Sequence, residues 1–446
     1  MTADDLLRGS RSATRDDHVP FPEDSWSPST GARSRRRGLA VLAAVLTLTS
    51  LPWLLGRTSP PPPPPVPAVS PGPGATPALR SATAWADAFD EQWRLTRAQV
   101  QGWAASGDSW DQYTLAYSID ALTSAYLATG RISYAEDGLR LLDAVAASSR
   151  PSADLPGSRF HDGYRGWASG LKEDGGDEVP LYESYLWRYG TGLLRVVRQD
   201  PALWSRPGVR SAYQRLLGVA VRDVFGKWWS RGPDSYIYRE RVHLSAHWAL
   251  IALNLDLLDP NPARRARYAT VVKEFVHGSV AERRPGLRAQ LVASPFDPKA
   301  WFWSDVWGSY DLPGQDVSHG NAVVTFAVEA HDLGIAVTDD DIRRFGYTLT
   351  SMVWPRPGPG AEHVDGSGTG TGWFSDGFVK LGRYDAALQA RLERHQPANG
   401  QFYAALALNA AILGCHEAGA DRPPACRPRH GLRPVDPGLR ALTPSG

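Results

Sequence analysis

The sequence predicts an all-α protein in which helices form an inner and an outer layer. Apolar residues recur at helical spacing in one segment after another between residues 83 and 414, and this periodicity is the main sign of amphipathic helices. Runs of alternating β-branched residues are almost absent. Alternate segments are apolar on all sides, as the buried inner helices of two concentric layers must be. Together these observations favour a ring of helical hairpins.

The residues before the helical region divide by composition into three parts. Residues 1–37 are polar and end in a cluster of arginines, so we expect a disordered cytoplasmic tail. Residues 38–56 (GLAVLAAVLTLTSLPWLLG) are apolar over about the length that crosses ~30 Å of hydrocarbon, which predicts one transmembrane helix. Residues 57–82 include six consecutive prolines and are expected to form an extended linker.

A cleaved signal peptide is the competing interpretation of this N-terminal region. The leader is long for a signal peptide, and no small-x-small cleavage site follows Leu55. We therefore favour an anchor, which predicts a single-pass protein of the cell membrane whose main domain lies outside the cytoplasm.

Residues 83–416 are predicted to form one helical domain, and residues 417–446 a C-terminal tail. In the second helical segment Leu115, Ile119 and Leu122 share one stripe, and Gly130 ends the helix. Helices are expected, in chain order, at 83–105, 110–129, 132–147, 181–199, 208–229, 241–257, 262–281, 317–333, 339–354, 373–382, 384–394 and 400–414. They would make about five or six inner–outer pairs.

Composition limits the partners. The net charge is +1 and no basic stripe or nucleic-acid motif is present, so we expect no nucleic-acid partner. Cys415 and Cys426 are close enough in sequence for a disulfide that holds the C-terminal tail. His243 and His247 are four residues apart, but the glutamate of the helical zinc motif and a third ligand are missing, so we expect no metal site. No cofactor is expected either.

Loop lengths indicate where function concentrates. Connections that follow the apolar segments are short, whereas those that precede them are long and rich in Gly, Trp, Tyr and acids. The long connections are 148–180, 230–240, 284–315 and 355–372. If the inner helices run parallel, these loops gather at one mouth above the inner-helix N-termini. Functional residues are frequent on loops that a rigid scaffold holds.

The first turns of the apolar segments carry the residues most able to do chemistry. The stretch QDVSHGNAVV, which begins at Gln315, places His319 and Asn321 at the start of a mostly buried helix. Neighbouring segments add Tyr185, Glu183 and His247, and we take these five as candidate catalytic residues. Candidate substrate-binding residues, mostly aromatic or basic side chains of the loops, are Trp303, Trp307, Arg188, Arg239, Tyr310, His363 and Trp373.

Two chemistries suit this inventory. In β-elimination on a uronic acid, Asn, Gln or protonated His neutralises the carboxylate, a Tyr or His removes the adjacent proton, and an acid protonates the leaving oxygen. In inverting glycoside hydrolysis, two carboxylates ~6.5–9.5 Å apart act as acid and base. Glu183 and Asp305 are among the carboxylates that could serve in the second scheme. Indoles of the loops could stack on sugar faces in either case.

From about residue 85 to residue 414, the helical hairpins and the candidate residues at the inner-helix N-termini resemble the (α/α) toroid superfamily. That group includes alginate- and heparinase-type polysaccharide lyases and the helical domain of uronyl C5-epimerases. In those lyases an Asn, one or two His and a Tyr at the cavity mouth carry the reaction. The resemblance assigns these roles to Asn321, His319, His247 and Tyr185, and it rests on architecture rather than on a family-specific string.

The resemblance implies a carbohydrate-active enzyme that acts on uronate-containing glycan by proton abstraction, as a lyase or an epimerase. An inverting glycoside hydrolase that uses Glu183 and a second acid is the alternative within enzymes. A non-catalytic glycan-binding protein of the cell envelope is the alternative outside them, because toroids also host members without activity. The expected partner is a polysaccharide or oligosaccharide in all three cases.

Overall fold

Helices make up most of the described chain, and its strands are two-residue pairs within loops. The computed structural model describes residues 79–279, 283–368, 370, 372–395, 399–416, 422–428 and 430–442. The α-helices are α2 (Ala82–Ala105), α3 (Ser109–Thr129), α4 (Ile132–Ser148), α5 (Pro180–Gln199), α6 (Pro201–Trp204), α7 (Pro207–Val219), α8 (Lys227–Arg231), α9 (Pro233–Tyr236), α10 (Val242–Leu258), α11 (Pro262–His277), α12 (Leu287–Gln290), α13 (Val317–Asp332), α14 (Asp339–Tyr347), α15 (Ala386–Leu392), α16 (Gly400–Leu413) and α17 (Pro437–Arg440).

Tighter and wider helical turns extend several of these helices. The π-helical turns Ala220–Gly226 and Thr348–Val353 continue α7 and α14. The 3₁₀ helix η5 (Phe378–Tyr384) stands where the sequence predicted a helix at 373–382. Shorter 3₁₀ turns are Ser152–Asp154, Lys172–Asp174, Gly414–His416 and Pro424–Cys426. The all-α fold class predicted from the sequence is therefore confirmed.

Local sequence signals explain several helix ends. Asp108 and Asp316 cap α3 and α13, each accepting a backbone N–H of the first turn, which would otherwise have no partner. Thr338 and Asp341 form a reciprocal capping box at α14. Gly130 ends α3 in the left-handed region, with φ 73°, where a residue without Cβ meets little steric resistance.

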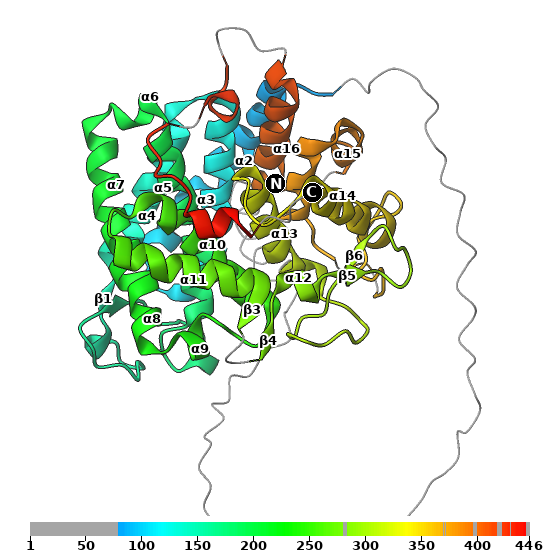
Figure 1. Ribbon diagram of the computed structural model, residues 1–446. Helices are drawn as coiled ribbons and strands as arrows, with labels where there is room; N and C mark the ends of the chain where they lie inside the picture. Colours follow the sequence, from blue (N-terminus) through cyan, green and yellow to red (C-terminus); the bar gives the residue numbers. More distant parts are fainter. Residues whose placement is uncertain are drawn as a thin grey trace, which may run out of the picture. The chain divides into compact units, whose positions relative to one another are not determined.

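The inner elements pack against one another in a closed series. Helix α3 packs against α5, α5 against α10, and α10 against α13. Helix α13 packs against η5, η5 against α16, and α16 against α3, so the series returns to its first member. The first and last long helices, α2 and α16, lie side by side as a result (Figure 1).

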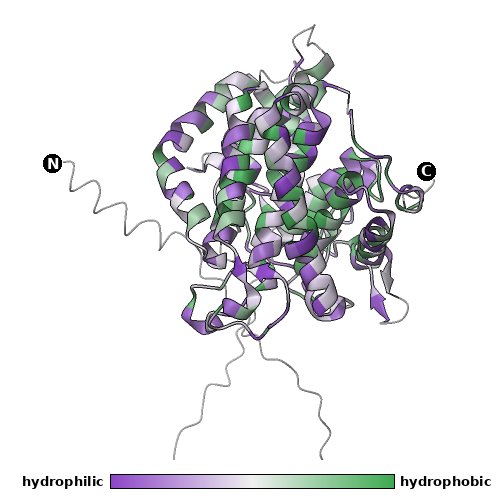
Figure 2. Ribbon diagram, turned by 90° about the vertical axis from the view of Figure 1, so that its left-hand side faces the viewer, coloured by the Kyte–Doolittle hydropathy of each residue, from purple (hydrophilic) through white to green (hydrophobic). Residues whose placement is uncertain are grey.

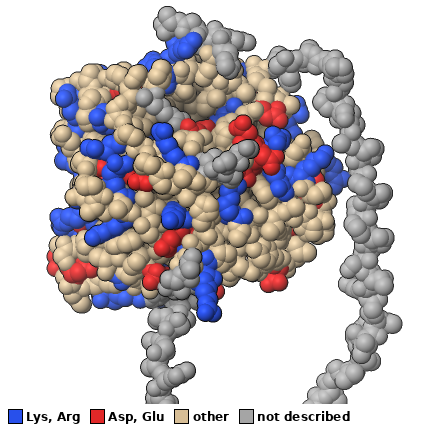
Figure 3. All heavy atoms as spheres, viewed as in Figure 1, with Lys and Arg blue, Asp and Glu red and all other residues tan. Residues whose placement is uncertain are grey.

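A second layer covers this series from outside. Helix α4 packs on α3, α7 on α5, α11 on α10, α14 on α13, α15 on η5, and α2 on α16. All residues of α10 are buried, whereas α11 buries one face only. Figure 2 shows hydrophilic and hydrophobic residues interspersed along the helices. On the face drawn in Figure 3, basic and acidic side chains are also interspersed.

The long connections lie against the N-termini of the inner helices. The strands pair antiparallel as β1 (Arg150–Pro151) with β2 (Arg165–Gly166), β3 (Gly278–Ser279) with β4 (Arg284–Pro285), and β5 (Val292–Ala293) with β6 (Trp301–Phe302). The first amide of α3 donates to the carbonyl of Ala168 over 3.0 Å, that of α10 to Asp305 over 2.7 Å, and that of α13 to Glu362 over 2.8 Å. Three long loops thus meet the start of three inner helices.

None of the described helices is long and apolar enough to span a membrane. A membrane span needs about 20 mainly apolar residues, but α10 has 17 and is buried among other helices, while α2 has 24 and carries charges along its length. This finding contradicts the prediction of a single-pass transmembrane protein of the cell membrane with an extracytoplasmic domain, and we withdraw that prediction. The segment 38–56, the tail 1–37 and the linker up to residue 78 lie outside the described residues.

The predicted disulfide between Cys415 and Cys426 is present and joins the end of α16 to the C-terminal segment. In the described part of that segment, Leu439 is buried and the Arg433 amide donates to the carbonyl of Leu257 over 3.2 Å. The segment is therefore fixed against the helical domain at more than one point.

Candidate functional site

Two histidines from neighbouring inner helices stack on each other at the N-terminal ends of those helices. His319 is in the first turn of α13 and His243 in the first turn of α10, and their ring centroids are 4.2 Å apart. A carboxylate holds each ring: Asp305 Oδ1 lies 2.8 Å from His243 Nδ1, and Asp316 Oδ2 lies 2.7 Å from His319 Nδ1. We call this arrangement the paired His–Asp dyads.

The fold positions both dyads through backbone contacts. Asp316 is the N-cap of α13, and its Oδ1 accepts the His319 amide over 3.0 Å. Asp305 lies on the loop whose carbonyl accepts the first amide of α10, and it also pairs with Arg241. The His319 side chain is 24% exposed and that of His243 is 3% exposed, so His319 is the more accessible of the two imidazoles.

Charge and burial set the protonation of the dyads. Burial alone would raise the pKa of Asp316, but the hydrogen bond and charge of His319 outweigh it and lower that pKa to about 2. Asp305 responds in the same way to His243 and Arg241, and its pKa also falls below the usual range. Burial, and then the neighbouring His319, lower the pKa of His243. At neutral pH the His243 imidazole is therefore neutral, whereas the carboxylates of Asp305 and Asp316 are ionised.

A row of aromatic side chains continues from the dyads across α10, α5 and α3. The ring of His247 lies 6.4 Å from that of His243 and 4.9 Å, edge to face, from that of Tyr185. The hydroxyls of Tyr185 and Tyr117 are 3.0 Å apart, and the Tyr117 ring lies 5.1 Å from that of Trp373. Tyr117 and Trp373 are partly exposed. The structure thus brings together His319, His247, Tyr185 and Trp373, which the sequence singled out separately.

The protonation of this row separates bases from acids. Burial holds the pKa of Tyr185 and of Tyr117 well above the usual phenol value, so both hydroxyls keep their protons. Burial, followed by the charge of Arg188, lowers the pKa of His247 well below the usual imidazole value. His247 Nε2 has no hydrogen-bond partner among the described residues. At neutral pH His247 is therefore unprotonated and both phenols are protonated, which are the states that a general base and a general acid have before the reaction.

Asn321 lies beside this row but is occupied by the backbone. Its side chain is fully buried, and its Nδ2 donates to the carbonyl of Trp373 over 2.7 Å. Its Oδ1 accepts the amides of Gly377 over 2.8 Å and Phe378 over 3.2 Å. The amide therefore anchors the loop that delivers Trp373 and begins η5, and it is not exposed to bind a substrate carboxylate.

Glu183 faces the outer layer rather than the mouth. Its Oε1 accepts Lys227 Nζ over 2.7 Å and its Oε2 accepts Trp228 Nε1 over 2.9 Å, and the side chain is fully buried. Burial raises the pKa of Glu183 to about 7, against the opposing charge of Lys227. The protonation is that of a general acid, but the position allows no substrate to reach it.

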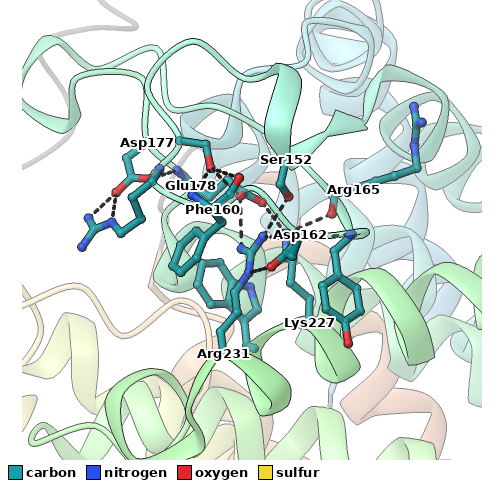
Figure 4. Close-up of polar contacts among 12 residues, drawn as sticks. Ser152, Phe160, Asp162, Arg165, Asp177, Glu178, Lys227 and Arg231 are labelled. Carbon is teal, nitrogen blue, oxygen red and sulfur yellow. Dashed lines mark hydrogen bonds and ion pairs between the residues drawn. The ribbon is translucent and has the colours of Figure 1, made fainter.

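The Lys227 cluster holds the long loop before α5 onto α8. Lys227 Nζ also donates to Glu178 Oε1 over 2.8 Å, and Arg231 Nη1 lies 3.1 Å from Glu178 Oε2. Arg231 donates to Ser152 over 2.8 Å and pairs with Asp162. Figure 4 shows these cations of α8 directed at the loop residues. We infer a structural role for the cluster, because its polar groups contact one another.

The remaining candidate binding residues divide between the core and the surface. Trp303 is fully buried against Phe345, so it packs in the core. Trp307 is partly exposed and donates Nε1 to the carbonyl of Arg239 over 3.0 Å, so these two residues support each other. Tyr310 is 47% exposed.

Arg188 and His363 complete the set predicted from the sequence. Arg188 is buried, donates to Asp376 over 2.7 Å, and places its guanidinium 4.1 Å from the centre of the Tyr185 ring. His363 is partly exposed and bridges through its backbone to Asp316, next to the dyads. Sequence reasoning missed Tyr117 as a member of the row, although the YTLAY spacing places Tyr113 and Tyr117 on one face of α3.

Within the described ranges, no group of three or more His, Cys, Asp or Glu side chains could hold a metal ion. No protein-family model, no curated protein and no solved structure matches this chain. Any assignment of function therefore depends on the site itself.

Proposed function

We propose that the two layers of helices form an (α/α)₆ toroid and that this chain is an acid–base enzyme acting on uronate-containing glycan. The toroid is supported by the closed series α3, α5, α10, α13, η5 and α16, each with one helix outside it. The enzyme is supported by one observation above all: the paired His–Asp dyads next to the Tyr185–Tyr117 hydroxyl pair, at the inner-helix N-termini.

In this proposal His319 is the base, because its imidazole is the more exposed one and Asp316 holds its Nδ1. The Nε2 atom of His319 removes the proton from the carbon next to the uronate carboxylate. The electron pair of that C–H bond forms the new double bond, and the bond to the leaving oxygen breaks with its electron pair going to that oxygen. The Tyr117 hydroxyl, partly exposed and 3.0 Å from that of Tyr185, supplies the proton that the leaving oxygen needs.

The carboxylate of the substrate must be neutralised for this reaction. The sequence suggested Asn321, but its side-chain amide is already bonded to four backbone groups. Arg241 takes that role in our proposal, because it is 37% exposed and lies against the Asp305 dyad. An epimerase would use the same base and return the proton to the opposite face of the same carbon.

Two-carboxylate hydrolysis has weaker support. The acid of such a pair needs a raised pKa, and Glu183, which has one, is fully buried in the Lys227 cluster. Asp305 and Asp316 are near the surface, but the pKa of each is lowered, which suits a base and not an acid.

The test incubates the purified full-length protein with polyuronates and neutral glycans while following unsaturated-uronate absorbance and reducing ends. We expect both signals to rise together on a polyuronate, and a rise in reducing ends alone would instead support hydrolysis. His319→Gln should lower kcat/KM by about a hundredfold or more, the usual range for losing a general base. His331→Gln is the matched control, because His331 lies at the other end of α13 and also pairs with aspartates.

If neither the unsaturated-uronate absorbance nor the number of reducing ends rises, epimerisation is the reaction left to test. Incorporation of deuterium from the solvent detects it. The proposal fails if no polyuronate yields unsaturated product or incorporates deuterium, or if His319→Gln and His331→Gln change the rate equally. A protein that binds glycan without changing it would give neither unsaturated product nor deuterium incorporation.

A further inference from the structure

A cavity of about 460 Å³ lies among the inner helices, toward their C-terminal ends. Residues of α3, α5, α10, α13, η5 and α16 all line it, together with residues 424, 425, 427, 428 and 430 of the C-terminal segment. On α13 the lining residues Thr325, Glu329 and Asp332 all follow His319, and Asp332 is the last residue of the helix, so the cavity extends to the end of α13 opposite the dyads.

A buried polar network forms the floor of the cavity. Lys380 Nζ donates to both Asp120 oxygens over 2.6 and 2.8 Å, and Gln401 Nε2 donates to Asp120 over 2.8 Å and to Asp376 over 3.1 Å. Arg188 completes the network through Asp376 and lies against Tyr185 on the other side. The network therefore lies between the cavity and the row of aromatic side chains that contains His247 and Tyr185.

Several buried side chains of the lining keep a polar atom with no hydrogen-bond partner in the described part of the chain. Two arginines supply donors of this kind, Arg188 through Nε and Nη1 and Arg383 through Nε. Asn254 Oδ1 and Thr325 Oγ1 supply acceptors. All four residues are at least nine-tenths buried. Buried polar groups are nearly always paired, so groups such as these indicate a bound water or ligand.

The charge balance of the lining indicates what kind of ligand fits. Each Lys or Arg of the lining is already matched by a carboxylate: Arg188 by Asp376 over 2.7 Å, Lys380 by Asp120, Arg383 by Asp332 over 3.0 Å, Arg427 by Asp200 over 3.5 Å, and Arg195 by Glu329. The cavity therefore has no surplus charge for an anion or a cation. It offers N–H donors and oxygen acceptors together, and a ligand hydroxyl can accept a hydrogen bond from the first and donate one to the second.

Apolar walls complete this environment. Leu127, Val196, Leu250 and Leu408 line the cavity between the polar groups, and such side chains suit the C–H faces of a sugar ring. The volume falls within the range of roughly 300–1,000 Å³ that is usual for small-molecule sites. We propose that this cavity is a second binding site, specific for an uncharged mono- or disaccharide.

The C-terminal segment closes the site in this proposal. Pro424, Ala425 and Arg427 line the cavity, and the Cys415–Cys426 disulfide holds this part of the segment to α16. The ligand would thus contact all six inner elements and the segment that covers them.

The test is isothermal titration calorimetry of the full-length protein with glucose, galactose, mannose, maltose and lactose, with glucuronate and inorganic phosphate as charged comparators. We expect at least one neutral sugar to bind at millimolar concentration or better, and more tightly than inorganic phosphate. Glucuronate bound at the proposed active site would be distinguished by its insensitivity to Thr325→Val. Thr325→Val removes an unpartnered hydroxyl, so binding should weaken about fivefold, the equivalent of one neutral hydrogen bond, while the midpoint of thermal unfolding should stay the same or rise.

Matched variants separate binding from folding. Thr348→Val is the control, because Thr348 is a buried threonine outside the cavity that bonds to Trp301; it should lose stability and keep binding. Ala425→Phe on the partly exposed covering segment should fill the cavity and abolish binding without unfolding the protein. His319→Gln should leave this binding unchanged, which separates the inference from the proposed activity.

The inference is overturned if no neutral sugar binds, if phosphate binds more tightly than every neutral sugar, or if Thr325→Val and Ala425→Phe bind as the parent protein does.

Discussion

Replacing Lys227 by methionine tests how strongly the buried ion cluster stabilises the fold. Lys227 has no exposed surface and compensates Glu178 and Glu183, which are equally buried. Arg231 would still face Glu178, but Glu183 would keep only the Trp228 N–H. Removing one partner of a buried ion pair costs about 3–5 kcal/mol, because a buried charge loses its compensation. We expect Lys227→Met to lower the free energy of unfolding by that amount above neutral pH.

The pH dependence of the loss gives the sharper test. The pKa of Glu183 is about 7 in the folded protein, against the usual glutamate value of 4.5. The folded state therefore binds this proton more tightly than the unfolded state, and stability falls as the pH rises from 4.5 to 7. Without the charge of Lys227 the folded pKa rises further, so the variant goes on losing stability above pH 7, by about 1.4 kcal/mol for each added pKa unit.

Urea denaturation at about pH 6 and about pH 8.5 measures both effects. Arg343→Met is the control, because the Arg343–Asp340 pair is some 60% exposed on both sides and should change stability by no more than about 0.5 kcal/mol. A loss below about 1 kcal/mol at the higher pH, or one that shrinks as the pH rises, would refute the argument.

Two further predictions concern the loop that Asn321 anchors. Asn321→Leu should cost about 3 kcal/mol, because two buried amides and a carbonyl lose their partner; a thermal midpoint equal to that of the parent would contradict this. Gly377→Ala should also destabilise, since a Cβ there would lie 2.1 Å from the Asn321 carbonyl oxygen, whereas Gly102→Ala, with nothing within 4 Å, should add about 0.5–1 kcal/mol. Equal thermal shifts for the two alanines would refute the steric argument.

Helical periodicity predicted much of the fold because each helix carries its own signal. The predicted segments 83–105, 110–129 and 400–414 correspond to α2, α3 and α16 within one residue at each end. Caps and stop residues such as Asp108 and Gly130 set these ends locally, so no knowledge of distant contacts was needed. The segment 373–382 was less accurate, because the bonds from Asn321 fix residues 377 and 378 at the start of η5.

The candidate site was predictable by position but not by contact. Helix starts placed His319, His247 and Tyr185 at one end of the inner elements. The sequence could not show that His243 stacks on His319, because that contact depends on how α10 packs against α13. Nor could it show that Glu183 points outward to Lys227, since both faces of α5 are buried. Residue type alone therefore put Glu183 and Asn321 among the candidate catalytic residues, although the polar atoms of both side chains are bonded to other groups of the protein.

The cavity escaped prediction for a related reason. Its lining residues come from all six inner elements and from the C-terminal segment, and they mix apolar, polar and charged side chains. Their arrangement around one volume depends on long-range packing, which spacing within a single helix does not encode.

The packing of α16 against α2 and α3 has a consequence for how the chain reaches its native state. These helices come from the two ends of the helical region, so the contacts that complete the inner series are among the most distant in the sequence. A ribosome releases α2 and α3 long before α16, and their apolar faces must wait for the last long helix. Contacts of such high sequence separation slow folding. We therefore expect the nascent chain to depend on chaperones until α16 has emerged, and a chain truncated before Gly400 to aggregate.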